Sequence, residues 1–415
     1  MDELIIIGKK AKLASGQLAH LNSQRKDRIL LRVAELLEKE TRALLKANAA
    51  DLEQAAQMNL KGAIVERLTL SEAKVAGIAE GLRQIALLED PIGEIGAMKK
   101  RPNGLLIGKK RVPLGVVGVI YESRPNVTAD VAGLCIKTGN VCVLRGGKEA
   151  FRSNRAIVKL FHQAIQEERL DPNMVQLVQD TTRESAVAMM QLNEYLDILI
   201  PRGGAGLIQT VVENSRVPVI ETGVGNCHIY VDEAADLQMA VSIVHNAKTQ
   251  RPGVCNAAES LLVHKDVARM VLPSIGARLM DEGVEVRGDR ATCKLVPGAV
   301  PARKEDWGTE YLDLVISSKV VASVEEAVDH INIHGSKHSE SIITENYSHA
   351  QYFLDRVDAA AVYVNASTRF TDGFEFGYGA EIGISTQKLH ARGPMGLKEL
   401  TTNKYVIYGS GQVRE

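Results

Sequence analysis

PLGVVGVIYESRPNVTAD, residues 113–130, decides how this chain folds. Its apolar run GVVGVI (115–120) has the length of a buried strand, and a polar turn leads from it into a segment with helical spacing. Similar apolar runs follow at 141–144, 175–178, 197–200 and 217–220. Helical segments separate them, near 127–138, 153–168, 183–192 and 206–214. Because strands that alternate with helices pair in parallel through right-handed crossovers, we predict a doubly wound α/β domain. Such domains bind ligands at the carboxyl ends of their strands.

A second alternation begins near residue 228. HIYV (228–231) and SLLV (260–263) are predicted strands, and helices are expected near 236–248 and 266–281. Later segments continue the pattern to about residue 360, which predicts a second α/β domain. The glycine-rich stretch FTDGFEFGYGAEIG that follows is not compatible with one regular element. We expect a long ordered loop there, then a final strand, KYVIYG (404–409).

The first 90 residues are predicted to be helical. One helix presents an apolar face made of Ile29, Val33, Leu36 and Leu37. Thr69 and Glu72 have the spacing of a capping box ahead of another helix, which Asp90-Pro91 ends.

The stretch KKRPNGLLIGKKRV (99–112) predicts an arm or hairpin, because Asn103-Gly104 is a typical hairpin turn. An arm this basic is expected to lie on the surface or against another subunit, so we expect a homo-oligomer. The predicted organisation has four parts. They are a cofactor domain (1–98 and 113–224), an oligomerisation arm (99–112 with 395–415), a catalytic domain (225–362) and a return segment (363–394).

Composition excludes several classes of protein. With 415 residues, 45% apolar and 24% charged, the chain is long enough for two or three ordinary globular domains. A net charge of −1 provides no basic field for nucleic acid or anionic lipid. No apolar run approaches the ~18 residues of a membrane span, and the start MDELIIIGKKAKLASG does not resemble a signal peptide. We therefore expect a soluble, cytoplasmic protein.

The cysteines are five in number and scattered: Cys135, Cys142, Cys227, Cys255 and Cys293. An odd count without a C-x-x-C pair argues against a disulfide framework and against a zinc site, and we expect no metal. Reduced thiols buried as small apolar residues are the default.

TQRPGVCNAAES (249–260) is a different setting for a cysteine. Cys255 follows Pro252-Gly253 and precedes small residues, in a loop rather than on an apolar face. Lys248 and Arg251 are close in sequence, and a nearby cation favours the reactive thiolate. The residues alone leave two interpretations open, a nucleophile or an inert buried thiol.

Two basic or glycine-rich turns follow predicted strands. PRGGAG (201–206) opens a helix where a dinucleotide phosphate would meet backbone N–H groups, although a plain tight turn explains it equally well. VLRGGKEA (143–150) places Arg145 and Lys148 after a strand, where two cations favour NADP over NAD. A solvated basic loop is the alternative.

Polar residues follow two further strands. Asn126 can donate to an oxyanion, or it can simply cap the next helix. Glu221 can act as a general base. Cys227 and His228 are adjacent on a predicted strand and point to opposite faces, so we expect an interior thiol and a hydrogen-bonded histidine rather than one metal site.

Taken in order, these motifs resemble the aldehyde dehydrogenase superfamily over nearly the whole chain. The resemblance implies a Rossmann-type cofactor domain, a second α/β catalytic domain and a small oligomerisation arm. It assigns Asn126 to the oxyanion hole and Cys255 to the nucleophile. Residues Arg145, Gly146, Gly147 and Lys148 match the ribose segment, and Pro201, Arg202, Gly203 and Gly204 match the pyrophosphate turn. Glu310, in GTEYLDL, resembles the glutamate that contacts the nicotinamide ribose.

Longer stretches resemble one branch of that superfamily. They are IYESRPNVT, VLRGGKEAFRSN, NCHIYVDE, NAKTQRPGVCN and VNASTRFTDGFEFGYGAEIGIST. This branch reduces L-glutamate 5-phosphate with NADPH in proline biosynthesis, and the resemblance also implies coupling to glutamate 5-kinase. Other members of the superfamily carry Pro-Trp-Asn where this chain has Arg124-Pro125-Asn126. The Trp is absent and a cation is present instead, which suits an anionic substrate. Arg124, Lys248, Arg251 and Glu221 are therefore candidate substrate-binding residues. The alternative is an oxidising dehydrogenase for a small polar or anionic aldehyde, which would need Glu221 as its base.

Overall fold

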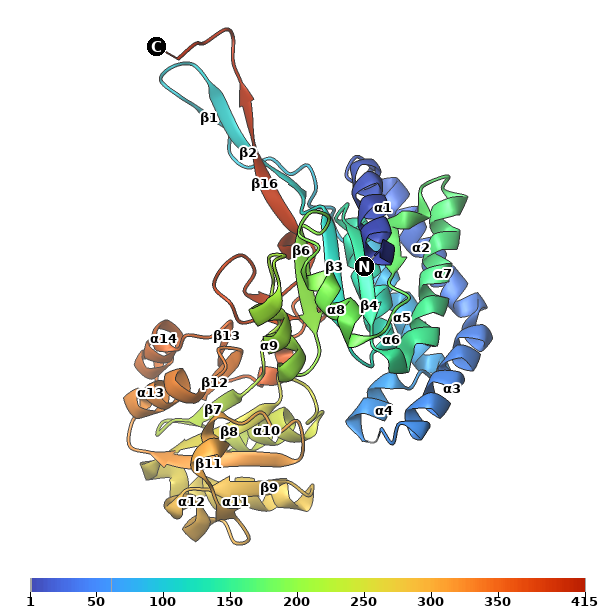
Figure 1. Ribbon diagram of the computed structural model, residues 1–415. Coiled ribbons are helices and arrows are strands. Elements are labelled where there is room, and N and C mark those ends of the chain that lie inside the picture. The colour runs from blue at the N-terminus through green and yellow to red at the C-terminus, as the bar shows by residue number, and fades with distance from the viewer. Residues whose placement is uncertain (1, 61, 415) are drawn as a thin grey trace. The chain divides into compact units, whose positions relative to one another are not determined.

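The computed structural model describes residues 2–60 and 62–414, and within them the chain forms two compact units (Figure 1). The first unit runs to Glu221 and also contains Gly377–Gly383 and the chain from Met395 onward. The second unit consists of Thr222–Phe376 and Ile384–Pro394. No helix among the described residues is long and apolar enough to cross a membrane.

The first unit begins with five helices. They are α1 (Asp2–Leu18), α2 (Ser23–Lys39), α3 (Thr41–Gln57), α4 (Ala63–Leu68) and α5 (Glu72–Leu87). The predicted apolar face of α2 is confirmed, because all four of its residues are buried. The predicted capping box is wrong. Ser71 caps α5 by accepting the Lys74 N–H, whereas the Thr69 hydroxyl donates to the Val65 carbonyl at the end of α4.

A parallel four-stranded sheet forms the centre of the first unit, in the order β5-β4-β3-β6. Its strands are β3 (Val116–Tyr121), β4 (Val141–Gly146), β5 (Val175–Leu177) and β6 (Ile198–Arg202). The accompanying helices are α6 (Pro125–Lys137), α7 (Phe151–Glu167), α8 (Arg183–Met190) and α9 (Ala205–Asn214), with short 3-10 turns η1 (Lys148–Ala150) and η2 (Pro172–Met174). The chain passes outward through β3, β4 and β5 and returns to place β6 beside β3, which is the reversal of a doubly wound sheet.

The predicted strand at 217–220 does not form as such. Only Val219 makes a bridge, to Leu199 of β6. Pro218 accepts from the Leu199 N–H but has no N–H of its own to donate, so a continuous ladder cannot form at this edge.

The arm of the first unit is a three-stranded antiparallel ribbon, drawn in cyan and red in Figure 1. It contains β1 (Lys99–Lys100), β2 (Leu106–Pro113) and β16 (Thr401–Tyr408), and β2 pairs with β16 from Leu106↔Tyr408 to Pro113↔Thr401. The expected turn at Asn103-Gly104 is present, with Gly104 at φ 86°. Tyr405, Ile407 and Tyr408 on the edge strand β16 are exposed.

The second unit is built on a seven-stranded parallel sheet, in the order β10-β9-β11-β8-β7-β12-β13. Its strands are β7 (Cys227–Val231), β8 (Ala258–His264), β9 (Glu285–Gly288), β10 (Val300–Pro301), β11 (Val315–Val321), β12 (Ser339–Ile343) and β13 (Ala361–Val364). Its helices are α10 (Leu237–Thr249), α11 (Lys265–Asp281), α12 (Arg290–Leu295), α13 (Val324–His334) and α14 (Tyr347–Arg356).

Both faces of this second sheet are covered, which explains the apolar runs in its central strands β7 and β8. Ile229 and Val231 pack with α10 and α11 on one side, while Tyr230 between them belongs to the cluster with Phe353 of α14 on the other. Side chains alternate across a strand, so a strand buried on both faces can be apolar along much of its length. The polar residues that this sheet does contain, such as His228 and Glu259, are buried and paired.

Short elements fill the remaining chain. They are η3 (Lys304–Gly308), η4 (Thr368–Phe370), β14 (Ile384–Ser385), β15 (Gly393–Pro394) and η5 (Lys398–Leu400). The return segment is otherwise irregular between β13 and β16, as its glycines predict.

Candidate active site

Cys255 lies at the amino-terminal edge of the second sheet. It is half-buried, forms no disulfide among the described residues, and lies in the loop 250–257 that connects α10 to β8. The usual ligand site of an open parallel sheet is the opposite, carboxyl edge. Cys255 lies instead among the loops that precede β7, β8, β11 and β12. The contacts of these loops determine how the candidate nucleophile is held.

Gly225 is the point of closest backbone approach. A Cβ built on it would overlap the Cys255 carbonyl, so no other residue fits at this position. The Gly225 N–H donates to the Glu310 carboxylate at 2.7 Å. Glu310 thus fixes the chain that supports the cysteine, in addition to the ribose contact that the resemblance implies for it.

Cys227 supports the same carbonyl from beneath. Its buried thiol donates to the Cys255 carbonyl oxygen at 3.2 Å. Burial raises the pKa of Cys227 well above its usual value, and the Glu340 charge adds to the effect. Cys227 therefore stays a neutral thiol and a hydrogen-bond donor. The expectation of an interior Cys227 and a hydrogen-bonded His228 is confirmed.

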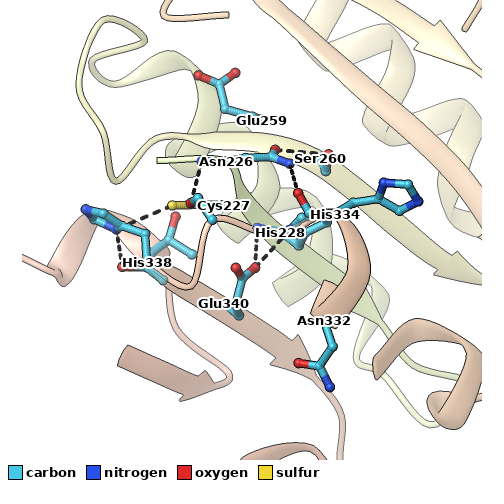
Figure 2. A network of polar contacts seen from close by, with 12 residues as sticks. Asn226, Cys227, His228, Glu259, Ser260, Asn332, His334, His338 and Glu340 are labelled. Carbon is cyan, nitrogen blue, oxygen red and sulfur yellow. Dashed lines mark hydrogen bonds and ion pairs between the residues drawn. The ribbon is translucent and has the colours of Figure 1, made fainter. Parts of the chain in front are cut away.

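A polar network connects the start of β7 with α13 and β12 (Figure 2). Asn226 donates through its amide to the Trp307 and His334 carbonyls, each at 2.9 Å. His228 donates its backbone N–H to Glu340 at 2.6 Å, and its Nδ1 lies 3.0 Å from the same carboxylate oxygen. The loop before β7 is therefore fixed by contacts to α13 and β12, elements more than a hundred residues away.

Sequence reasoning missed this network. Its signal is HINIHGSKHSE (330–340), where three histidines and two serines crowd the end of a helix and the start of a strand. His338 Nδ1 lies 2.8 Å from the Ser339 hydroxyl, which donates to Thr371 at 2.7 Å. The network thus extends to the return segment.

His330 is held neutral inside this region. Its ring packs edge-on against Trp307 and lies 4.6 Å, centre to centre, from the ring of His334. Burial lowers the pKa of His330 to about 3, with a further contribution from His228. Its Nε2 has no hydrogen-bond partner among the described residues.

Lys248 forms a buried ion pair across the loop 250–257, which carries Cys255. Its ammonium lies 2.6 Å from Glu259, and both side chains are inaccessible to solvent. The other Glu259 oxygen accepts the Leu312 N–H at 3.1 Å. Burial raises the pKa of Glu259 to about 7 and lowers that of Lys248. Lys248 closes the α10–β8 loop from inside, which argues against its predicted contact with substrate, because a substrate anion would have to displace Glu259.

Arg251 and Glu221 are in different settings. Arg251 is exposed directly after α10 and makes no ion pair or side-chain hydrogen bond among the described residues. It remains a candidate for substrate binding. Glu221 is half-buried and is the last residue of the first unit before Thr222.

The turn after β3 positions Arg124 and Asn126. Ser123 has φ 32°, and its N–H and hydroxyl both donate to Glu149. Arg124 occupies the cap position of α6, so the alternative in which Asn126 caps that helix is wrong. Asn126 is exposed in the first turn and donates to Asp130 at 3.0 Å. Burial raises the pKa of Asp130 to about 6.

Arg145 is held by backbone rather than presented to solvent. Its Nη2 donates to the Thr181 and Thr182 carbonyls at 2.7 and 2.6 Å. This arrangement uses the cation to tie β4 to the loop after β5, which argues against Arg145 as a reader of a 2′-phosphate. Lys148 in η1, in contrast, is exposed and forms no ion pair among the described residues.

The PRGG turn, the predicted pyrophosphate site, lies at the amino terminus of a helix. Gly203 and Gly204 are exposed between β6 and α9, and a Cβ at Gly204 would meet nothing within 4 Å. The Gly204 N–H donates to the Glu122 carboxylate at 3.0 Å. The Glu122 carboxylate thus lies at the start of α9, where the amino terminus of a helix favours negative charge. Pro201 is buried and Arg202 half-buried at the end of β6, and Gly146 and Gly147 are buried after β4.

One group of potential metal ligands occurs among the described residues, namely Glu233, His264 and Asp266. The carboxylates approach opposite ring nitrogens of His264, each at 3.7 Å. The His264 ring also accepts the Asp266 N–H as the cap of α11. Helix capping explains this group without a metal.

Comparisons with known proteins place this chain. Residues 3–294 match the family model described as "Aldehyde dehydrogenase family". The gamma-glutamyl phosphate reductase of Carboxydothermus hydrogenoformans is 59% identical over 414 residues, with 100% of each chain covered. The crystal structure of gamma-glutamyl phosphate reductase from Thermotoga maritima is 50% identical, covers 100% of both chains and has a TM-score of 0.96. An acetylating aldehyde dehydrogenase from Geobacillus thermoglucosidasius is 18% identical, covers 100% of this chain and 98% of its own, and shares the fold with a TM-score of 0.71.

Removing Lys248 should expose the cost of an unpaired buried charge. We expect Lys248→Met to lower the free energy of unfolding by about 3–5 kcal/mol, because Glu259 then remains buried without its partner. Urea titration measures this. The matched control is K248M/E259L, in which both charges are gone and most of the loss should be recovered. Equal destabilisation of the single and double variants would contradict this assignment.

His330 should make the second unit sensitive to acid. Its native pKa lies below its unfolded value, so the unfolded chain takes up the proton first and stability falls as the pH drops from about 6.5 toward about 3. Each pH unit in that window costs about 1.4 kcal/mol. We expect His330→Gln to flatten the decline in unfolding free energy between pH 7 and pH 5 by about 1–2 kcal/mol. Ile333→Gln on the exposed side of α13 is the control, and parallel curves for the two variants would refute the assignment.

Proposed function

This chain belongs to the aldehyde dehydrogenase family, as a member of its gamma-glutamyl phosphate reductases, and we propose that it reduces L-glutamate 5-phosphate to L-glutamate 5-semialdehyde and phosphate with NADPH. Relatives of full length carry the name of this reductase, which favours the reduction over the oxidising alternative. Proline biosynthesis is the process in which this reaction is expected.

The observation that carries the proposal is the environment of Cys255. A half-buried thiol stands in a loop whose carbonyl is held by the Cys227 thiol and packed against Gly225. The segment that leads into β7 thus fixes the backbone of a cysteine whose side chain is half-buried. A fixed nucleophile needs little reorganisation as it attacks a carbonyl carbon.

The proposed chemistry proceeds in two displacements. The Cys255 thiolate attacks the acyl carbon, the bond from that carbon to the phosphate oxygen breaks with its electron pair on oxygen, and a thioester remains on the enzyme. Asn126 and the Cys255 backbone N–H are proposed, from the resemblance, as donors to the oxyanion. A reductase that starts from an acyl phosphate has no hydrolytic step, so we assign Glu221 no role as a deacylating base.

Residues of the first unit are proposed to hold the cofactor. The exposed glycine turn at the start of α9 suits its pyrophosphate, which would replace the Glu122 carboxylate on the Gly204 N–H. Exposed Lys148 suits the 2′-phosphate of NADPH. When bound, the cofactor would supply the hydride for reduction of the thioester carbon. The carbon–sulfur bond then breaks with its electron pair on Cys255, which releases the semialdehyde and restores the thiolate. The contribution of these residues is binding and orientation.

The arm supports the proposal of a homo-oligomer. Edge strand β16 presents Tyr405, Ile407 and Tyr408 to solvent, and an exposed apolar edge strand is a template for pairing with another chain. We propose a second copy of this chain as the partner. Location in the cytoplasm and coupling to glutamate 5-kinase remain predictions from the sequence and its resemblance.

Replacing the nucleophile should abolish turnover. We expect Cys255→Ser to lower kcat by at least about a thousandfold, because a serine hydroxyl is not ionised near neutral pH. The assay follows NADP reduction with glutamate 5-semialdehyde and phosphate, and repeats it without phosphate. Cys293→Ser is the control, since that thiol is also half-buried but donates to the Gly288 carbonyl in another part of the unit. Near-normal rates for C255S would end the proposal.

Lys148 should set the cofactor preference. We expect Lys148→Gln to reduce the ratio of kcat/KM for NADPH over NADH by about tenfold or more, the value of one charged hydrogen bond. Lys159→Gln, on the exposed side of α7, should leave the ratio unchanged. An unaltered ratio in K148Q would show that Lys148 does not contact the 2′-phosphate.

A further inference from the structure

One guanidinium holds both ends of the nucleophile loop. Arg369 lies on η4 of the return segment, and its Nε donates to the Gln250 side chain at 2.9 Å. Its Nη1 donates to the Asn256 side-chain oxygen. Gln250 opens the loop 250–257 and Asn256 follows the cysteine directly. The arginine therefore spans the segment that carries Cys255.

The neighbours of Arg369 strengthen this connection. The Thr368 hydroxyl donates to the Asn256 carbonyl at 2.8 Å. The Asn256 amide donates in return to the Thr371 carbonyl at 2.8 Å and to the Arg369 carbonyl at 3.3 Å. Asn256 is buried and its side-chain amide and backbone carbonyl are all bonded to residues 368–371. The position of the cysteine is thus coupled to the position of the arginine.

This corner of the second unit carries two guanidiniums, those of Arg251 and Arg369. Neither Arg251 nor Arg369 has an ion-pair partner within 4.0 Å among the described residues, and Arg369 Nη2 has no protein hydrogen bond there. Partial burial lowers the pKa of Arg369, and the charge of Arg251 lowers it further. Asp372, Cys255 and Cys227 act in the opposite direction. Two guanidiniums that repel each other beside a thiol form a site that an anion would stabilise.

We propose that Arg369 and Arg251 form an anion site beside Cys255 that receives the phosphoryl group of the acyl phosphate. This inference rests on the proposed function, and it identifies the residues that bind the phosphate leaving group. A guanidinium fork matches the oxygens of a phosphoryl group, and two cations stabilise the negative charge that grows on it as the carbon–oxygen bond breaks. Arg369 also acts as a positioning residue, because its other nitrogens hold the loop.

The test measures anion binding without turnover. Iodoacetamide is allowed to alkylate the purified full chain in the absence of cofactor, and labelling of Cys255 is followed by mass spectrometry with increasing inorganic phosphate. We expect saturable protection in the wild type. Arg251→Gln and Arg369→Gln should each weaken the affinity for phosphate by about tenfold or more. Arg278→Gln, an exposed arginine on α11, is the control and should retain full protection.

Further arms of the experiment separate the alternatives. L-Glutamate carries carboxylates and no phosphoryl group, so protection by L-glutamate but not by phosphate would overturn the assignment. The same holds if phosphate fails to protect the wild type, or if R251Q and R369Q are protected as well as R278Q. Arg251 is exposed, so R251Q keeps the test valid even if R369Q fails to fold.

A conservative variant separates charge from positioning. We expect Arg369→Lys to keep the KM for phosphate in the reverse reaction within about threefold of wild type, while kcat falls because the bonds to Gln250 and Asn256 are lost. An unchanged kcat would remove the positioning role. Protection by phosphate does not depend on turnover, so a failed anion site is distinguishable from a failed nucleophile assignment in the C255S assay.

Discussion

The second unit depends on a charge pair that solvent does not reach. Lys248 and Glu259 stand at the two ends of the loop that carries Cys255, and their contact fixes where α10 stops and β8 starts. A buried pair is a weak source of net stability, because desolvation offsets most of its attraction. The pair instead restricts the conformation of the loop. Separating the two charges would cost free energy, so one position of the loop is favoured. Glu259 also accepts the Leu312 N–H, and Glu310, in the same loop as Leu312, accepts the Gly225 N–H. The ion pair is thereby connected to the segment before β7.

This constraint explains how the candidate nucleophile can be held at the amino edge of a parallel sheet. At the carboxyl edge, strand ends and helix amino termini direct N–H groups toward a ligand, whereas the amino edge lacks that arrangement. Here side chains replace it. Cys227 supports the Cys255 carbonyl, and Asn256 is bonded to the segment around Thr371. The positioning is therefore done by long-range polar contacts.

The sequence predicted the two sheets well because their strands are buried on both faces. The continuous apolar runs inside β3, β4, β7 and β8 leave little choice of structure. Prediction failed where one residue changed the local chemistry, as at Pro218, or where two neighbours offered equivalent caps, as at Thr69 and Ser71. The histidine network was missed because its partners come from strands and helices far apart in sequence, and no local period marks them.

Assignment of the cations was the least predictable part of the site, for the same physical reason. A basic residue near a motif is available to a substrate only if no protein group has already used its charge. Lys248 is used by Glu259 and Arg145 by two backbone carbonyls, and these partners lie 11 to 37 residues away. Arg251 and Lys148 have the same local sequence character but remain exposed and without ion pairs in the described structure. The cations that a fold leaves unneutralised, rather than those nearest to a motif, are therefore the ones to assign to an anionic substrate or cofactor.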